Sequence, residues 1–195
     1  DGHKNDHDHH NHHPINVFFL DGPDAGTATI LVLRNVHPDS CYVANRHQSS
    51  CDALRIHRTG LSNISCSSAT TALSPGGDFH GVVPFGAYYF DGCGGHVPQI
   101  VDMIEAALGG KGQEKREQQN MQGPIAIGFS IVGGGRDVVD KEVQVVQSLV
   151  GLSKANGMRV NHVFDDPSSY GVDPGLRKIN GGTMTSWFVL EPRES

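Results

Sequence analysis

Long apolar runs and an excess of positive charge are both missing from this sequence of 195 residues. No stretch approaches the roughly 20 apolar residues that a transmembrane helix needs, so we expect no membrane span. Lys and Arg number 15 against 21 Asp and Glu, for a formal net charge of −6, and no basic stripe is present. This charge balance argues against a nucleic-acid partner. The length suits one domain rather than two, and a hydrophobic fraction of 37% is low but sufficient for its core.

The short motifs that mark many catalytic sites are missing too. The chain has no G-x-S-x-G nucleophile elbow, no H-E-x-x-H zinc motif and no P-loop. A glycine-rich stretch, "IVGGGRDVV", lacks the P-loop spacing, and we expect a tight turn there. His80 and His96 flank a strand-like segment that contains Asp91, so a strand-end site is the catalytic alternative. On balance we expect a protein that is not an enzyme.

Only four cysteines are present, and none of them forms a C-x-x-C pair. We expect two disulfides, with three possible connectivities, among Cys41, Cys51, Cys66 and Cys93. A zinc site built from these four is less expected, because structural zinc sites usually have closely spaced ligand pairs. Asn63-Ile64-Ser65 is a sequon for N-glycosylation at Asn63, and the first residue is Asp1 rather than Met. Together these features predict a secreted, extracellular protein.

The composition divides the chain into a polar arm, residues 1–14, and one globular domain, residues 15–195. In the first half of the domain, hydrophobic and β-branched runs predict strands. These expected strands are residues 15–22, 27–36, 41–45, 53–60 and 81–92. The Ser- and Gly-rich residues 62–77 predict a long loop between two of them.

The second half of the domain alternates between two kinds of pattern. Helical periodicity predicts helices from Pro98 to Leu108 and from Asp137 onward, the second with a core stripe of valines. That stripe is Val139, Val143, Val146 and Val150. Strands are expected at residues 124–132, 158–164 and 185–192. We therefore predict an α+β fold, a mixed or antiparallel sheet with two amphipathic helices on one face, with a small α/β sandwich as the alternative.

The arm is rich in histidine and aspartate, and imidazole is the commonest side-chain ligand of Zn, Cu and Ni. Its candidate metal ligands are Asp1, His3, His7, His9, His10, His12 and His13. Asp1-Gly2-His3 resembles the amino-terminal copper- and nickel-binding motif, in which a free amine, two backbone amides and an imidazole form a square-planar site. An affinity tag and a disordered arm without a ligand are the alternatives.

These observations predict a secreted, non-enzymatic protein that self-associates through its arm, with divalent Cu, Ni or Zn as a bound metal. The apolar "INVFFL" that follows the arm could pair with a neighbouring copy, giving a homo-oligomer or a filament. Two alternatives stay open: a secreted protein that scavenges copper, zinc or nickel, and a small secreted toxin, effector or hydrolase.

Overall fold

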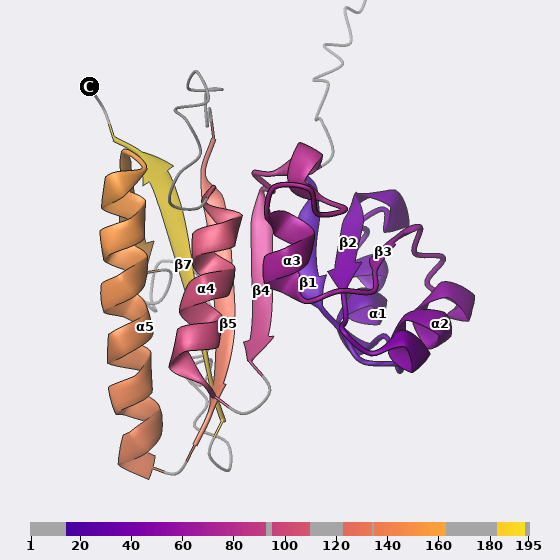
Figure 1. Cartoon of the computed structure of the whole chain (residues 1–195), viewed down its shortest axis with the longest axis horizontal. Coiled ribbons are helices and arrows are strands. Elements are labelled where there is room, and N and C mark those ends of the chain that lie inside the picture. The colour runs from indigo at the N-terminus through magenta and orange to yellow at the C-terminus, as the bar shows by residue number, and fades with distance from the viewer. Residues whose placement is uncertain (1–14, 93–94, 110–122, 134, 163–182, 194–195) are drawn as a thin grey trace, which may run out of the picture.

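Seven strands of the described residues form a single sheet, in the order β3-β2-β1-β4-β5-β7-β6 (Figure 1). The structure is a computed structural model, and it describes residues 15–92, 95–109, 123–133, 135–162 and 183–193. The strands are β1 (Val17–Leu20), β2 (Cys41–Ala44), β3 (Asn63–Ser65), β4 (Ala87–Gly92), β5 (Ile125–Val132), β6 (Met158–His162) and β7 (Thr183–Pro192). Neighbouring strands run parallel except at β7, which is antiparallel to both β5 and β6.

Helices cover both faces of this sheet. They are α1 (Gly26–Leu33), α2 (Gln48–Ile56), α3 (Ala69–Leu73), α4 (Val97–Ala107) and α5 (Gly135–Ala155), with short 3-10 turns at Pro38–Ser40 and His80–Val82. The helices α3, α4 and α5 lie on the near face in Figure 1 and supply the larger core, while α1 and α2 pack on the far face over a smaller one. No helix of the described residues is both long and apolar enough to cross a membrane.

The predicted α+β fold is therefore wrong, and so is the small-sandwich alternative. The sheet is mostly parallel and is wound in both directions from β1, because the chain builds β2 and β3 on one side and then returns to place β4 on the other. Parallel neighbours need a crossover, and helices provide it on both faces. The predicted arm, residues 1–14, lies outside the described residues.

The segment 27–36 was expected to be a strand, and the structure has helix α1 there instead. Thr, Ile and Val favour strands by propensity, and the segment has no helical periodicity to signal otherwise. A residue that precedes the helix stabilises its amino end. The carboxylate of Asp21 accepts hydrogen bonds from the amides of Thr27 (3.3 Å) and Ala28 (2.8 Å). Capping by a residue several positions upstream thus overrides local propensity.

Two further predictions from the first half are wrong. The expected strand at 53–60 is largely occupied by α2, and the expected loop at 62–77 contains both β3 and α3. Helix α3 begins after Ser68, whose hydroxyl accepts a hydrogen bond from the amide of Thr71 at 3.1 Å. Serine is a preferred cap residue, so the same composition that predicted a loop also marks a helix start.

The second half agrees with its predicted elements, since α4, β5, α5, β6 and β7 all form close to their expected positions. The core stripe of α5, however, agrees with the prediction only at Val146, which is partly buried against the core. Val138, Val145 and Leu149 are fully buried, whereas the predicted Val139, Val143 and Val150 are 37%, 49% and 47% exposed. Valines occupy two adjacent faces of this helix, so periodicity alone does not show which face is buried. Packing against the sheet determines the buried face.

Candidate functional site

The strand order reverses between β1 and β4, and this reversal creates a site at the carboxyl edge of the sheet. In open α/β sheets the helices after such neighbouring strands leave in opposite directions, and ligands bind in the crevice between them. Three polar residues follow or end the strands there, and we call them the switch-point site: Asp21 after β1, Asn45 after β2 and Asp91 in β4.

The carboxylate of Asp21 caps the amino end of α1. Its Oδ1 accepts from the amide of Gly22 at 3.0 Å, in addition to the contacts with the amides of Thr27 and Ala28. Partial burial raises the pKa of Asp21, and these amide donors oppose that increase without cancelling it. Because the amides of Thr27 and Ala28 are already taken by an anion, they are not free to bind a phosphate group.

Asn45 ties the ends of three strands together. Its Nδ2 donates to the backbone oxygen of Asp21 at 2.8 Å, and its backbone amide donates to the carbonyl of Ser65 at 3.0 Å. Its Oδ1 accepts from the amide of His47 at 2.8 Å. A side-chain carbonyl oxygen has two lone pairs, so Asn45 can still accept one more hydrogen bond from a ligand.

Asp91 is the least engaged of the three residues. Its carboxylate is exposed, and among the described residues no hydrogen bond or ion pair engages it. Partial desolvation by its surroundings raises its pKa. A carboxylate that has a raised pKa and that no described residue engages is suited to accept a proton from a ligand.

Aromatic and hydroxyl side chains lie beside Asp91 on the face opposite α4 and α5. The rings of Tyr89 and Trp187 stack with centroids 5.5 Å apart and planes at 9°, over Gly128. A Cβ atom on Gly128 would lie 2.6 Å from the indole, so only glycine leaves room for this stack. The Ser130 hydroxyl lies 2.8 Å from both the Tyr89 hydroxyl and the Thr185 hydroxyl.

The register of the strands connects this group to the switch-point site. Asp91 is paired with Ser130, and Ser130 with Thr185, so the carboxylate and the two hydroxyl groups form one row across β4, β5 and β7. Because paired residues of neighbouring strands point to the same face, the Tyr89–Trp187 stack lies one row below Asp91. The arrangement places a proton acceptor next to a flat aromatic surface.

The predicted metal ligands of the arm all fall within residues 1–14, outside the described residues. Within the part of the chain that the structure describes, no group of three or more His, Cys, Asp or Glu could hold a metal ion. His80 lies in the turn that precedes β4, whereas His96 lies beyond its carboxyl end at the start of α4. The two histidines that flank Asp91 in sequence therefore lie before and after the strand, and only His96 follows its carboxyl end.

The structure has Cys41, Cys51 and Cys66 as free cysteines, and Cys93 lies outside the described residues. The two expected disulfides thus stay a prediction. Asn63 is in β3, where its Nδ2 donates to the backbone oxygen of Asp39 at 2.8 Å. Its glycosylation also stays a prediction, and a glycan on that nitrogen would replace one of its two hydrogens.

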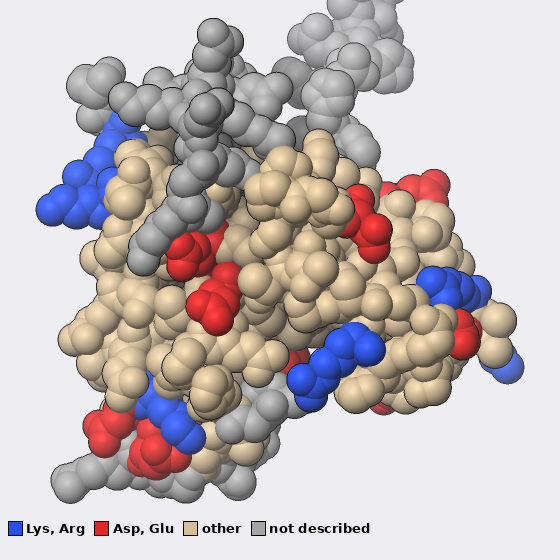
Figure 2. All heavy atoms as spheres, in the orientation of Figure 1, with Lys and Arg blue, Asp and Glu red and all other residues tan. Residues whose placement is uncertain are grey.

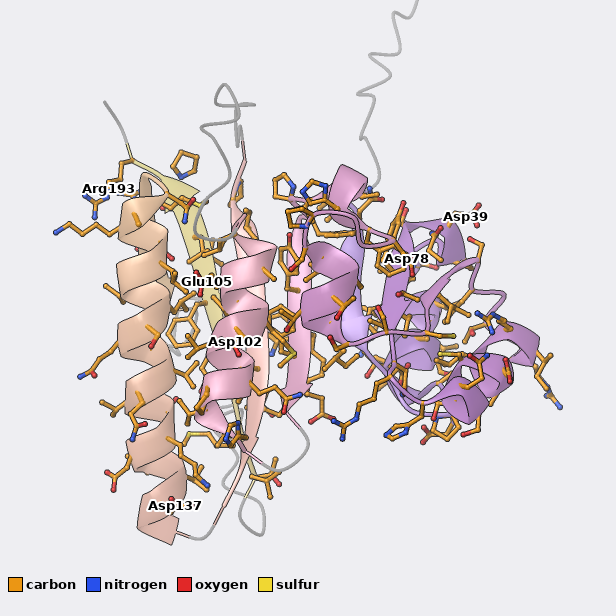
Figure 3. All side chains as sticks on the ribbon, viewed as in Figure 1. Asp39, Asp78, Asp102, Glu105, Asp137 and Arg193 are labelled. Carbon is orange, nitrogen blue, oxygen red and sulfur yellow. The ribbon has the colours of Figure 1, made fainter. Side chains whose placement is uncertain are left out.

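The glycine-rich stretch leads from β5 into α5, as expected of a turn. Asp137 marks the amino end of α5 in Figure 3, and its carboxylate pairs with Lys141 at 2.7 Å. Asp102 and Glu105 lie on α4, on the face seen in Figure 3. Basic side chains on that face are scattered and form no patch among the described residues (Figure 2).

Neither a family model nor a curated protein sequence matches this chain. Solved structures do match its fold. A candidate rRNA methylase from Clostridium thermocellum aligns with a TM-score of 0.53 at 11% identity, covering 92% of this chain and 88% of that one. The Dnmt2 methyltransferase of S. pombe aligns with a TM-score of 0.51 at 9% identity, covering 93% of this chain and 50% of that one. The chain has a Rossmann-like methyltransferase fold.

This fold overturns the predicted function. A secreted, non-enzymatic structural protein that forms filaments was expected, and so were a metal scavenger and a small toxin or hydrolase; the chain instead has the architecture of a class of enzymes. The prediction that Cu, Ni or Zn is the bound cofactor is likewise wrong, and the described residues contain no metal site.

Sequence reasoning placed Asp91 in a possible strand-end site but missed Asp21 and Asn45. Asp21 and Trp187 fall within the expected strands 15–22 and 185–192, and neither was expected to belong to a site. One signal was present: the segment "LDGPDAGT" joins a hydrophobic strand to a Gly-containing turn, as a ligand-binding strand–turn–helix unit does. That signal depends on a helix after the turn, and the β-branched composition of residues 27–36 hid the helix.

Proposed function

We propose that this chain is a methyltransferase that uses S-adenosylmethionine, bound in the crevice at the switch-point site. The observation that carries the proposal is the fold, a doubly wound sheet with the antiparallel β7 between β5 and β6, which aligns over most of its length with a candidate rRNA methylase of known structure. The geometry of the crevice is compatible with this cofactor in two respects, its charge and its free hydrogen-bond acceptor.

The charge at α1 favours a cationic ligand over a phosphate-containing one. A dinucleotide places its pyrophosphate on the first helix of the sheet, but the Asp21 carboxylate takes the amides of Thr27 and Ala28 here. S-adenosylmethionine has no phosphate and carries a positive sulfonium and a positive ammonium group. A carboxylate at the mouth of the crevice attracts such a ligand and repels a pyrophosphate.

Asn45 is placed to bind the ribose of the cofactor. In dinucleotide-binding sheets an acidic residue about 20 positions after the first strand accepts hydrogen bonds from the ribose hydroxyl groups. Asn45 follows β2 at a corresponding place, and its Oδ1 keeps one lone pair for a hydroxyl donor. Its Nδ2 is held by the backbone of Asp21, so the side chain is already oriented before a ligand binds.

Bound S-adenosylmethionine supplies a methyl group on a positively charged sulfur, which a nucleophilic acceptor can displace. The chain's own residues orient the acceptor and handle its proton. Tyr89 and Trp187 offer a flat surface on which a planar acceptor can stack. Asp91, which no described residue engages and whose pKa is raised, is placed to take the proton that the acceptor loses.

Titration calorimetry with S-adenosylmethionine and with NADP tests the proposal. We expect the wild-type protein to bind the first and not the second. Asp21→Asn removes the charge and should weaken binding about tenfold, the effect of roughly 1.4 kcal/mol. Asp140→Asn, an equal change of charge on the exposed face of α5, should leave binding unchanged. Binding of NADP alone, or equal weakening by both variants, would contradict the proposal.

Partners and localisation rest on the sequence alone. We propose an acceptor that is not a nucleic acid, because the net charge is −6 and the basic side chains in Figure 2 are scattered. Homo-oligomerisation through residues 1–14 and an extracellular location are further proposals, supported by the polar arm and by the sequon at Asn63. Light scattering with and without residues 1–14 tests the first, and the glycan mass on Asn63 in the natural protein tests the second.

A further inference from the structure

Two thiols lie next to each other beside the switch-point site, where α2 meets the end of β3. The thiol of Cys51, in the first turn of α2, donates to the backbone oxygen of Asn45 at 3.2 Å and approaches that of Ser65 at 3.8 Å. Ser65 is the last residue of β3, and its carbonyl group is bonded directly to Cys66. The sulfur of Cys51 therefore approaches the carbonyl group that precedes Cys66 in the chain.

The two thiols have different surroundings. Cys51 is fully buried, whereas Cys66 is partly exposed and accepts a hydrogen bond from the Arg55 guanidinium at 3.2 Å. Desolvation, with the neighbouring Cys66 as a second contribution, raises the pKa of Cys51 to about 11. An external reagent therefore reacts first with the partly exposed Cys66, and the buried Cys51 reacts second.

We propose that Cys51 and Cys66 form a reversible disulfide that links α2 to the end of β3, with a small disulfide such as oxidised glutathione as the oxidant. The Cys66 thiolate attacks one sulfur of the oxidant and releases one glutathione thiolate. Cys51 then loses its proton to water, attacks the Cys66 sulfur and releases the second glutathione. The two protein thiols lose two electrons and two protons, and the oxidant is reduced to two thiols.

This disulfide would change the neighbourhood of Asn45. Oxidation removes the thiol hydrogen that Cys51 donates to the Asn45 carbonyl, and it closes a loop of about 15 residues. Closing such a loop should lower the unfolding equilibrium constant roughly a hundredfold. The proposal does not depend on the methyltransferase function, because it needs only the two thiols and an oxidant.

Glutathione redox buffers, followed by intact mass and peptide mapping under non-reducing conditions, test the proposal on the full chain. We expect a loss of two hydrogens from the wild-type protein, a Cys51–Cys66 crosslink in its peptide map, and reversal by dithiothreitol. Cys41→Ser, a matched control at a buried cysteine, should form the same crosslink. Cys51→Ser should instead accumulate glutathione on Cys66, while Cys66→Ser should leave Cys51 unmodified.

The wild-type map alone decides the outcome if a variant does not fold. A crosslink between Cys66 and Cys93, or a folded wild-type protein that keeps both thiols free in oxidised glutathione, would overturn the proposal. Arg55→Gln gives a second measurement, since loss of the guanidinium contact with the Cys66 sulfur should change the rate of the first step without changing the final crosslink. An unchanged rate would remove Cys66 as the first thiol to react.

Discussion

The two sides of the switch point are built differently. On one side, β1, β2 and β3 have four, four and three residues, and α1 and α2 pack over a small core. On the other, β4, β5 and β7 have six, eight and ten residues, and α4 and α5 cover a large apolar core. We call these the short-strand side and the long-strand side.

The difference shows how the molecule divides its tasks. On the short-strand side, β1, β2 and α3 also contribute to the large core, but polar contacts join the strand ends: Asp21 caps α1, Asn45 connects three strand ends and Cys51 donates to Asn45. The long-strand side is joined mainly by burial, with Phe129 stacked on Phe188. Polar groups that are positioned by loops can bind a ligand, while a stiff apolar sheet keeps them in place.

Replacing one buried phenylalanine on each side should give the largest effect. Phe129→Ala should lower the free energy of unfolding by about 3–5 kcal/mol, because its cavity lies within the large core. Phe19→Ala should cost less, since the small core around it can relax into the space. Urea denaturation of both variants measures the difference, and a larger loss for Phe19→Ala would refute the division into two sides.

Two glycines on the long-strand side provide a second test. Gly128→Ala should cost about 1–3 kcal/mol, because the new methyl group would meet the Trp187 ring at 2.6 Å. Gly151→Ala is the control: nothing lies within 4 Å of its Cβ position, and alanine in this helix should stabilise by about 0.5–1 kcal/mol. Thermal unfolding and the near-UV signal of Trp187 report both changes. Equal stability of the two variants would rule out the tight stack.

The raised pKa of Asp91 predicts a pH dependence of stability. Because the folded pKa lies above the ordinary value of 3.8, the unfolded chain loses this proton first as the pH rises. Stability therefore falls between pH 3.8 and the folded pKa, and the effect is complete above it. Asp91→Asn should remove this part of the decline, as unfolding in urea across pH 3 to 7 would show. An unchanged slope in the variant would mean that Asp91 is not desolvated.

The smallest effect is expected at the exposed edge of the long-strand side. Arg159 in β6 pairs with Glu191 in β7 at 2.7 Å, but the arginine side chain is 56% exposed. Arg159→Gln should change the free energy of unfolding by less than about 1 kcal/mol, and less still at high salt. A loss of several kcal/mol in urea denaturation would show that this edge is held by charge rather than by the core.

The same division explains what the sequence could predict. On the long-strand side, α4 and β5 follow from periodicity and buried runs, because burial leaves a regular pattern. On the short-strand side, α1 depends on a cap at Asp21 that lies outside its own segment, so no local pattern reveals it. The site could not be predicted either, because Asp21, Asn45 and Asp91 meet only through the strand order.

The most direct test of the central claim is a titration of the isotopically labelled protein with S-adenosylmethionine, followed through its backbone amide resonances. We predict saturable shifts of the amides of Asp21, Thr27, Ala28, Asn45 and Asp91, at the carboxyl edge of β1, β2 and β4. The amides of Arg159 and Glu191, at the far edge of the sheet, should stay unchanged. No saturable shift, or shifts confined to that far edge, would contradict the assignment of the crevice as a cofactor site.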